Sequence, residues 1–286
     1  MARIAIITDS TADLPPAAAA AAGVLVVPLY VRFGDQEFQA GVNLSTEQFW
    51  ERMLAPGAPI PSTAAPSPGT FRETFEACFA EGAEAIVCPV IGSKLSATFQ
   101  SATLAAREFP DREIQVIDTG STSMCTGFPA LLAAEMAAAG AGSAEIAARI
   151  RDRLPDLDLF VAVDTLEYLR KGGRLSRAQA AIGTVLSVKP IITVRDGIVV
   201  VAERTRTRSR ARERVTDLVT ARPLERIAII HTPTSPPDEV AAFRDQLIAR
   251  IPGGIDPAFV STTLLGASTG PHLGPGLMGA AFLRRQ

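Results

Sequence analysis

The first half of the chain alternates short apolar runs with longer segments of helical character. Apolar runs bounded by turn residues predict strands, at residues 4–8, 24–31, 85–91 and 114–118. Helices are predicted after Leu14, from the capping box of Ser45 and Gln48 through Leu54, and after Ser143 as a cap. Further helices are predicted at residues 68–81, 96–108 and 127–139. Strands that alternate with helices indicate a parallel sheet covered on both faces.

The pattern changes near residue 155. A strand is expected at 159–163, and two short helical pieces are expected around Gly172 and Gly173. Arg195-Asp196-Gly197 separates two apolar runs and predicts a hairpin. Further strands are expected at 226–231, 258–263 and 276–283, and helices at 209–220 and 236–249, the latter capped by Ser235.

We therefore predict an α/β protein with two domains. Residues 1–155 would form an N-terminal α/β domain with a parallel sheet. Residues 156–286 would form a C-terminal α+β domain with a mixed or antiparallel sheet, because a hairpin makes that sheet at least partly antiparallel. A chain of 286 residues is also longer than most single cores.

Composition narrows the function only a little. A net charge of −2 gives no general attraction to nucleic acid, and three cysteines without a CxxC pair argue against a disulfide framework or a cysteine zinc site. Two histidines exclude a histidine-rich metal centre. The N-terminus lacks a signal-peptide pattern and no apolar run reaches the length of a membrane span, so we expect a cytoplasmic protein with no membrane span.

Hydroxyl-rich loops follow three of the predicted strands. They begin at Thr8, Gly92 and Asp118, and a proline-rich loop before the helix at 68–81 adds Ser62 and Thr63. Ligands of open α/β sheets bind beyond the carboxyl ends of the strands, and hydroxyls with helix N-terminal amides suit an anion. Each loop taken alone is equally typical of helix capping, but three loops at one sheet edge favour a binding site.

An enzyme remains as the alternative. Asp9, Asp118 and Asp164 could bind magnesium, although capping is the simpler role for them. A metal-dependent phosphohydrolase or phosphotransferase would use Asp9 and Asp118. The chain has no dinucleotide fingerprint, P-loop or G-x-S-x-G nucleophile motif.

Two further features have open interpretations. His272 lies among glycine and proline residues, where a regular element is not expected to pack it, and either a ligand contact or a structural hydrogen bond would explain it. His231 ends a strand and is expected to be structural. Arginines occupy every second position from Arg204 to Arg214, split between a strand end and a helix, which favours a solvated or protein-docking surface over a nucleic-acid patch.

Several of these segments together resemble the DegV family. The resemblance is carried by motifs in the family's order over nearly the whole chain: Thr8-Asp9-Ser10-Thr11-Ala12-Asp13-Leu14, Ser93-Lys94-Leu95-Ser96-Ala97-Thr98-Phe99-Gln100-Ser101-Ala102, Asp118-Thr119, Leu166-Glu167-Tyr168-Leu169-Arg170-Lys171-Gly172-Gly173-Arg174, Lys189-Pro190 and His272-Leu273-Gly274-Pro275-Gly276. In the proline-rich loop Ala64 and Ala65 replace the family's usual Ser and Gln, and Ala97 replaces a common glycine.

The resemblance implies a non-catalytic fatty-acid-binding subunit of a bacterial fatty acid kinase. Its ligand would be a long-chain fatty acid such as palmitate, stearate or oleate, held between the two domains, and no cofactor is implied. Thr63 and Ser93 would hydrogen-bond the carboxylate, with His272 nearby. Arg170 and Arg174 would belong to the face that meets the kinase subunit.

A fatty acid is a physically reasonable ligand for such a site. Burial contributes roughly 0.8 kcal/mol per methylene, so a C16 chain offers on the order of 11 kcal/mol before the costs of association. The head group then needs hydrogen-bond donors to replace its water, because an unpaired buried carboxylate is costly.

Overall fold

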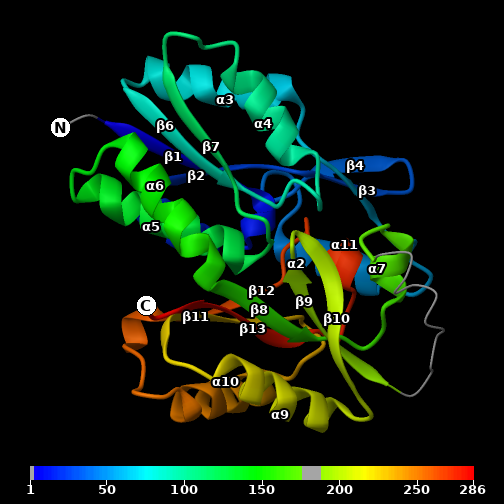
Figure 1. Ribbon diagram of the computed structural model, residues 1–286. Coiled ribbons are helices and arrows are strands. Elements are labelled where there is room, and N and C mark those ends of the chain that lie inside the picture. The colour runs from blue at the N-terminus through cyan, green and yellow to red at the C-terminus, as the bar shows by residue number, and fades with distance from the viewer. Residues whose placement is uncertain (1–2, 176–187) are drawn as a thin grey trace. The chain divides into compact units, whose positions relative to one another are not determined.

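A parallel sheet with strand order β2-β1-β6-β7 organises the first part of the chain (Figure 1). The computed structural model describes residues 3–175 and 188–286. The four strands are β1 (Ile4–Asp9), β2 (Val24–Val27), β6 (Ala85–Val90) and β7 (Glu113–Asp118). All residues of β6 are buried, as expected for a central strand of a sheet covered on both faces. The predicted parallel sheet is confirmed.

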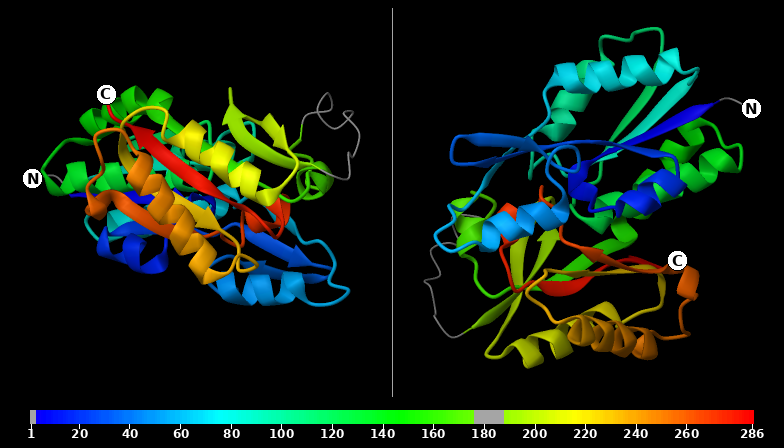
Figure 2. Two further views of the ribbon diagram at one scale, coloured as in Figure 1. Left: turned by 90° about the horizontal axis from the view of Figure 1, so that it is seen from below. Right: turned by 180° about the vertical axis from the view of Figure 1, so that it is seen from behind.

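Helix pairs pack on the two faces of this sheet (Figures 1 and 2). The helices are α1 (Pro16–Ala21), α3 (Pro68–Ala80), α4 (Thr98–Ala106), α5 (Met124–Ala138) and α6 (Ser143–Arg153), with the short 3-10 helix η1 (Ser10–Ala12) after β1. Phe71 and Phe75 of α3 join α4 in one core cluster. Ile146 and Ile150 of α6 join α5 in the other.

The strand predicted at 24–31 is two strands in different sheets. Pro28 separates β2 from β3 (Tyr30–Phe33), which pairs with β4 (Gln36–Gln39) in a small sheet of order β4-β3-β5. The third member is β5 (Ser62–Ala64). Proline has no N–H for a strand ladder, so the change of sheet at this position is understandable.

The second part of the chain has a mixed sheet of order β10-β9-β8-β13-β11-β12. Its strands are β8 (Leu157–Ala162), β9 (Lys189–Arg195), β10 (Ile198–Thr205), β11 (Leu224–His231), β12 (Val260–Leu264) and β13 (Met278–Arg284). The predicted hairpin joins β9 to β10 through Asp196 (φ 52°) and Gly197 (φ 76°). Two consecutive positive φ angles are the requirement of a type I′ turn. β11 and β12 pair in parallel and the other pairs are antiparallel, which confirms the mixed sheet.

Two long helices cover one face of the mixed sheet (Figures 1 and 2). These are α9 (Arg208–Val219) and α10 (Pro237–Arg250), which pack through Val215, Phe243 and Leu247 onto the apolar side chains of the sheet. The helices α2 (Thr46–Leu54), α7 (Glu167–Lys171) and α11 (Gly270–Leu273) are shorter, as are the 3-10 helices η2 (Leu154–Asp156) and η3 (Pro257–Phe259). Within residues 3–175 and 188–286, no helix combines the length and apolar character needed to cross a membrane.

The chain divides into two compact units. One comprises Met1–Ser45 and Thr63–Pro155, and the other Thr46–Ser62 and Asp156–Gln286. The sequence predicted a single domain boundary near residue 155. In the structure the segment Thr46–Ser62, which contains α2, also belongs to the second unit. The cause is the apolar face of α2, whose Trp50 is buried and donates its indole N–H to the carbonyl of Leu265 at 2.8 Å.

Some of the predicted helix boundaries were right and others wrong. Ser67 caps α3, as its hydroxyl accepts the Thr70 N–H at 3.1 Å. Ser143 is the first residue of α6 rather than its cap, and α10 begins after Pro236 without a side-chain cap from Ser235. Of the two helical pieces expected around Gly172, α7 is present and the piece after Gly173 lies outside the described residues.

Candidate ligand-binding site

The carboxylate of Asp9 ties together two strand ends in the first unit. One oxygen accepts the N–H of Thr11 at 2.8 Å and the hydroxyl of Thr11 at 2.5 Å. The other oxygen accepts the N–H of Ile91, just past the end of β6, at 2.8 Å. Burial raises the pKa of Asp9, and the hydrogen bonds from Thr11 and Ile91 act in the opposite direction. Asp9 therefore has a structural role at the start of the loop that carries Ser93.

The loop of Ser93 is built against the loop that follows β7. Gly92 donates its N–H to the carbonyl of Ser121 at 2.8 Å, and a Cβ on Gly92 would lie 2.8 Å from the carbonyl carbon of Gly120. Asp118 Oδ1 accepts the N–H groups of both Ser93, at 3.1 Å, and Gly120, at 2.8 Å. These contacts fix the backbone of Ser93, so the position of its half-buried Cβ is set before any ligand arrives.

Thr63 belongs to the same unit as Ser93. It is the middle residue of β5 and is half-buried, whereas the adjacent residues Ser62 and Ala64 are exposed. Successive residues of a strand point to opposite faces, so Thr63 and Ser62 present their hydroxyls in different directions. The strand itself was missed in the sequence, because three residues flanked by prolines give no apolar run.

The third predicted ligand contact, His272, lies in the second unit. It is part of the one-turn helix α11, so the expectation that no regular element packs it was wrong. α11 packs against α7. A Cβ on Gly172 would overlap the imidazole Nδ1 of His272, and a Cβ on Gly274 would overlap the ring of Tyr168. Burial, with a contribution from the charge of Arg174, lowers the pKa of His272 to about 4, so its imidazole is neutral at pH 7.

The turn that carries His272 is also packed against α2. A Cβ on Gly270 would overlap the ring of Phe49 and would lie 3.2 Å from the indole of Trp50. Phe49 and Trp50 are fully or almost fully buried. Sequence reasoning missed this contact, and the glycines at 270, 274 and 276 are the signal that could have indicated close packing on several sides.

The two arginines predicted to meet a partner differ in their environments. Arg170 of α7 is exposed. Arg174 is half-buried, and its Nη1 donates to the carbonyl of Gly172 at 2.5 Å. Burial lowers the pKa of Arg174. Only Arg170 therefore has the exposure expected of a simple surface contact.

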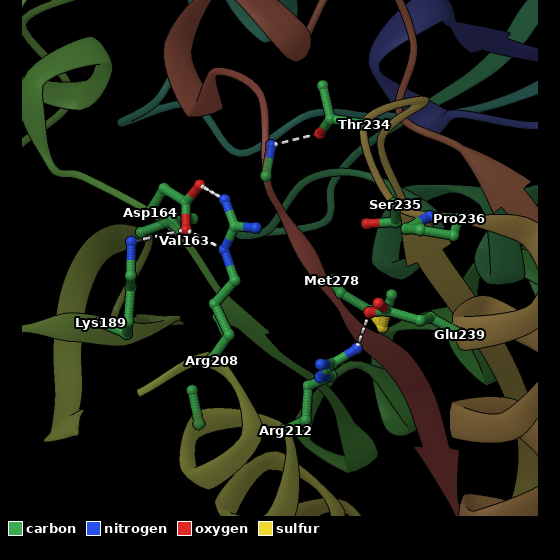
Figure 3. Close-up of a pocket in the computed structure, with 13 residues that line it drawn as sticks. Val163, Asp164, Lys189, Arg208, Arg212, Thr234, Ser235, Pro236, Glu239 and Met278 are labelled. Carbon is green, nitrogen blue, oxygen red and sulfur yellow. Dashed lines mark hydrogen bonds and ion pairs between the residues drawn. The ribbon is translucent and has the colours of Figure 1, made fainter. Parts of the chain in front are cut away.

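A polar pocket in the second unit has a volume of about 190 Å³. Figure 3 shows Asp164 in contact with Lys189 and Arg208 at one side, and Arg212 with Glu239 at the other. Burial raises the pKa of Asp164, but hydrogen bonds and charge from Arg208 and Lys189 prevail and lower it overall. Small-molecule pockets usually occupy about 300–1,000 Å³ and are mostly apolar, so this charged pocket is not suited to an acyl chain.

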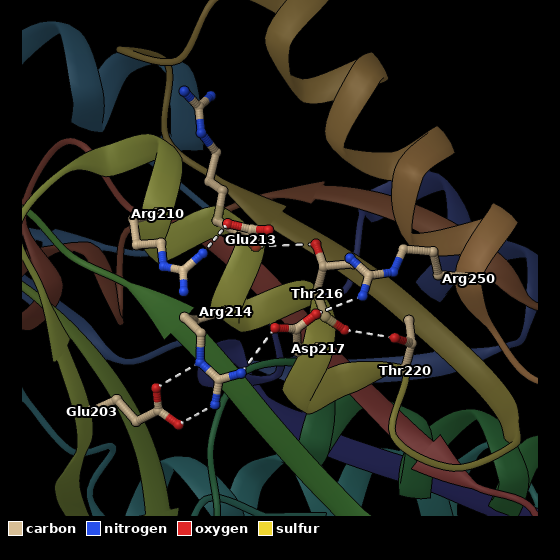
Figure 4. A network of polar contacts seen from close by, with 9 residues as sticks. Glu203, Arg210, Glu213, Arg214, Thr216, Asp217, Thr220 and Arg250 are labelled. Atoms are coloured by element: carbon tan, nitrogen blue, oxygen red, sulfur yellow. Dashed lines mark hydrogen bonds and ion pairs between the residues drawn. The ribbon is translucent and has the colours of Figure 1, made fainter.

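The alternating arginines are largely paired with acidic side chains. Arg214 contacts Glu203 at 2.7 Å and Asp217 at 2.8 Å, and Arg250 joins the same network through Asp217 at 2.5 Å (Figure 4). Arg208, Arg210 and Arg212 also each pair with an acid. Exposed pairs of this kind add little stability, but they neutralise the positive charge that a nucleic-acid surface would need.

The carboxylates of the alternative enzyme are engaged elsewhere. Asp9 and Asp118 accept backbone N–H groups, and Asp164 pairs with Lys189 and Arg208. In the described part of the chain, no group of three or more His, Cys, Asp or Glu side chains is placed to hold a metal ion. These contacts do not support the magnesium-dependent alternative.

Comparisons with known proteins agree with the fold and the motifs. The model of the DegV family, described as uncharacterised, matches residues 3–285. A DegV domain-containing protein of Streptomyces coelicolor is 37% identical over 286 residues, which is 99% of each chain. The protein DegV of Bacillus subtilis is 30% identical over 284 residues, or 98% of each chain.

Solved structures give the same result. The DegV family protein of Thermus thermophilus, described as binding fatty acid, has a TM-score of 0.88 at 34% identity and covers 99% of this chain and 100% of its own. The structure of DegV from Bacillus subtilis, described as a fatty acid binding protein, has a TM-score of 0.87 at 29% identity with complete coverage of both chains. The chain described here belongs to the DegV family.

Proposed function

We propose that this protein binds a long-chain fatty acid and presents its carboxylate to a kinase subunit for phosphorylation. The observation that carries the proposal is its likeness, over the whole chain, to solved structures described as fatty acid binding. The protein is then a non-catalytic carrier, and the phosphoryl transfer takes place on the partner. Palmitate, stearate and oleate are the ligands of the expected length.

The head group chemistry is consistent with the predicted contacts. Ser93 and Thr63 offer hydroxyl donors, and the neutral imidazole of His272 offers an N–H in one of its tautomers. Hydrogen bonds to a charged group are worth about 1.5–3 kcal/mol each, so a few such donors compensate for the water that a carboxylate loses. A carboxylate held only by neutral donors keeps its nucleophilic oxygen available to a phosphorylating partner.

Mass spectrometry of lipid extracted from the purified protein tests the binding. We expect a co-purified fatty acid of C16 or C18 length, and uptake of palmitate, stearate or oleate by delipidated protein. A protein that holds no fatty acid and takes up none would overturn the proposal. Ser93→Ala is expected to weaken uptake by about 10- to 100-fold, which corresponds to one lost hydrogen bond to a charged group.

Acyl phosphate formation with a fatty acid kinase subunit tests the presentation. Arg170 is exposed on α7, and Arg170→Glu should block acyl phosphate formation while fatty acid binding is retained. The matched control is Arg107→Glu, a charge reversal at an exposed arginine of the first unit, which should leave both activities intact. Equal loss of phosphorylation in the two variants would contradict a docking role for Arg170.

A further inference from the structure

The helix α7 and the turn of His272 approach each other more closely than side chains normally allow. Added Cβ atoms on Gly172 and Gly274 would overlap His272 and Tyr168 respectively, and one on Gly276 would overlap the carboxylate of Asp164. Asp164 and Tyr168 lie on the segment that enters and forms α7. Three glycines thus join the two segments at successive points, so a movement of one segment is transmitted to the other.

Arg174 lies at the end of this contact. Its backbone N–H donates to the carbonyl of Leu169 at 3.0 Å, and its guanidinium donates to the carbonyl of Gly172 at 2.5 Å. Gly172 is the residue whose α-carbon faces the imidazole of His272. The guanidinium therefore closes the turn that packs on His272, which is a different role from that of an exposed docking residue.

We propose that Arg174 is a positioning residue for His272, and that it couples the partner-facing α7 to the carboxylate-binding end of the fatty acid site. This inference rests on the proposed function for its ligand and partner. When the partner displaces α7, the carbonyl of Gly172 and the guanidinium of Arg174 move with it, and the contact of Gly172 with His272 is altered. The hold of His272 on the carboxylate then changes at the moment when the carboxylate must be released to phosphorylation.

The side chains packed around His272 show why Arg174 is the residue to substitute. α2 contributes uncharged Phe49 and Trp50 at Gly270, and α7 contributes Tyr168 at Gly274. Asp164, at Gly276, is engaged by Lys189 and Arg208. Burial is the main cause of the low pKa of His272, about 4, and the charge of Arg174 lowers that pKa further.

Nuclear magnetic resonance of the histidine side chains is the direct test, since the chain has only two histidines. His272→Gln identifies the signals, and His231 serves as an internal reference. In Arg174→Gln we expect the pKa of His272 to rise from about 4 toward the ordinary value of 6.5. In Arg170→Gln, the matched control at an exposed arginine of α7 just before the turn of Arg174, the pKa of His272 should not move. An unchanged His272 in Arg174→Gln, or equal shifts in both variants, would overturn the proposal.

A second variant acts on the packing and leaves every charge in place. Gly172→Ala has no backbone cost from a positive φ, but its methyl group would displace the imidazole. We expect altered His272 signals and at least tenfold weaker fatty acid binding. Gly142→Ala, whose added methyl group meets no atom within 4 Å, should change neither. A wild-type affinity and unchanged His272 signals in Gly172→Ala would contradict the coupling.

The two proposals fail in different ways. The signals of His272 are read without ligand, so they test the action of Arg174 even if the protein takes up no fatty acid. If fatty acid binds and the Arg174 and Gly172 variants leave His272 unchanged, the coupling is wrong and the binding function stands.

Discussion

The backbone N–H of Ser93 donates to the carboxylate of Asp118 at 3.1 Å, so a residue from the end of β7 fixes the residue that follows β6. The same oxygen accepts the N–H of Gly120 at 2.8 Å. A predicted ligand contact and a predicted metal ligand are thereby brought together, with the carboxylate acting on the backbone. The sequence left open a ligand-binding loop and a metal-dependent enzyme, and the backbone contacts of Asp118 are those of a residue that supports the loop.

Replacement of Asp118 by Ala and by Asn distinguishes these roles. Asp118→Ala removes the acceptor of two N–H groups, and leaving such groups unpaired costs about 1–3 kcal/mol each when they are buried. We expect it to loosen the Ser93 loop and weaken fatty acid binding. Asp118→Asn keeps an oxygen acceptor and should retain most of the binding. A magnesium-dependent hydrolytic activity abolished by both variants would instead favour the enzyme.

The hydroxyls of β5 provide a second pair of variants. Thr63→Ala should weaken fatty acid binding by about 10- to 100-fold if its hydroxyl bonds the carboxylate. Ser62→Ala should have no effect, because Ser62 is exposed and successive strand residues face opposite ways. Titration of delipidated protein with a fluorescent fatty acid measures both. Equal affinities for the two variants would remove Thr63 from the site.

The elements that the sequence predicts well are those with strong local signals. β6 has six consecutive buried residues and reads as a buried strand in any context. The Asp196-Gly197 pair adopts the positive φ angles that its turn requires, and Ser67 caps α3 as the sequence indicates. Each of these depends on interactions within a few residues, which a single sequence contains.

The elements that the sequence does not predict depend on distant partners. β4 is exposed or half-buried throughout and forms a strand because β3 pairs with it. α11 is too short to show a helical period, and Phe49 and Tyr168 pack closely on Gly270 at its start and on Gly274 just after its end. The candidate site follows the same division. The loop of Ser93 could be chosen from its place after β6, and Ser93 itself from the family resemblance. The support from Asp118 and the effect of Arg174 on His272 required the structure.

The ion pairs of Asp164 predict a loss of stability in acid. Its folded pKa lies below the ordinary value of 3.8, because Arg208 and Lys189 outweigh the effect of burial. The stabilisation is therefore present above pH 3.8 and is lost as the pH falls through the lower folded pKa. Asp164→Asn should lower the free energy of unfolding at pH 7 by about 1–3 kcal/mol, measured by urea denaturation.

A matched control for Asp164 is available on the same segment. Glu167 pairs with Lys171 at 2.8 Å, but both side chains are about half exposed. Glu167→Gln should change the free energy of unfolding little, since exposed pairs contribute little. If Asp164→Asn were no more destabilising than Glu167→Gln, the Asp164 cluster would not stabilise the second unit.

The two histidines predict a separate pH dependence at higher pH. Burial lowers the pKa of both His231 and His272 from the ordinary value of 6.5, and that of His272 reaches about 4. Between pH 4 and pH 6.5 the unfolded chain binds more protons than the folded protein, so the free energy of unfolding rises with pH. The free energy of unfolding has its full value, with respect to the histidines, above pH 6.5 and declines as the pH falls toward 4. Urea denaturation at several pH values measures this slope. His272→Gln should remove most of it and His231→Gln a smaller part, and an unchanged slope in His272→Gln would show that His272 is not held neutral by the fold.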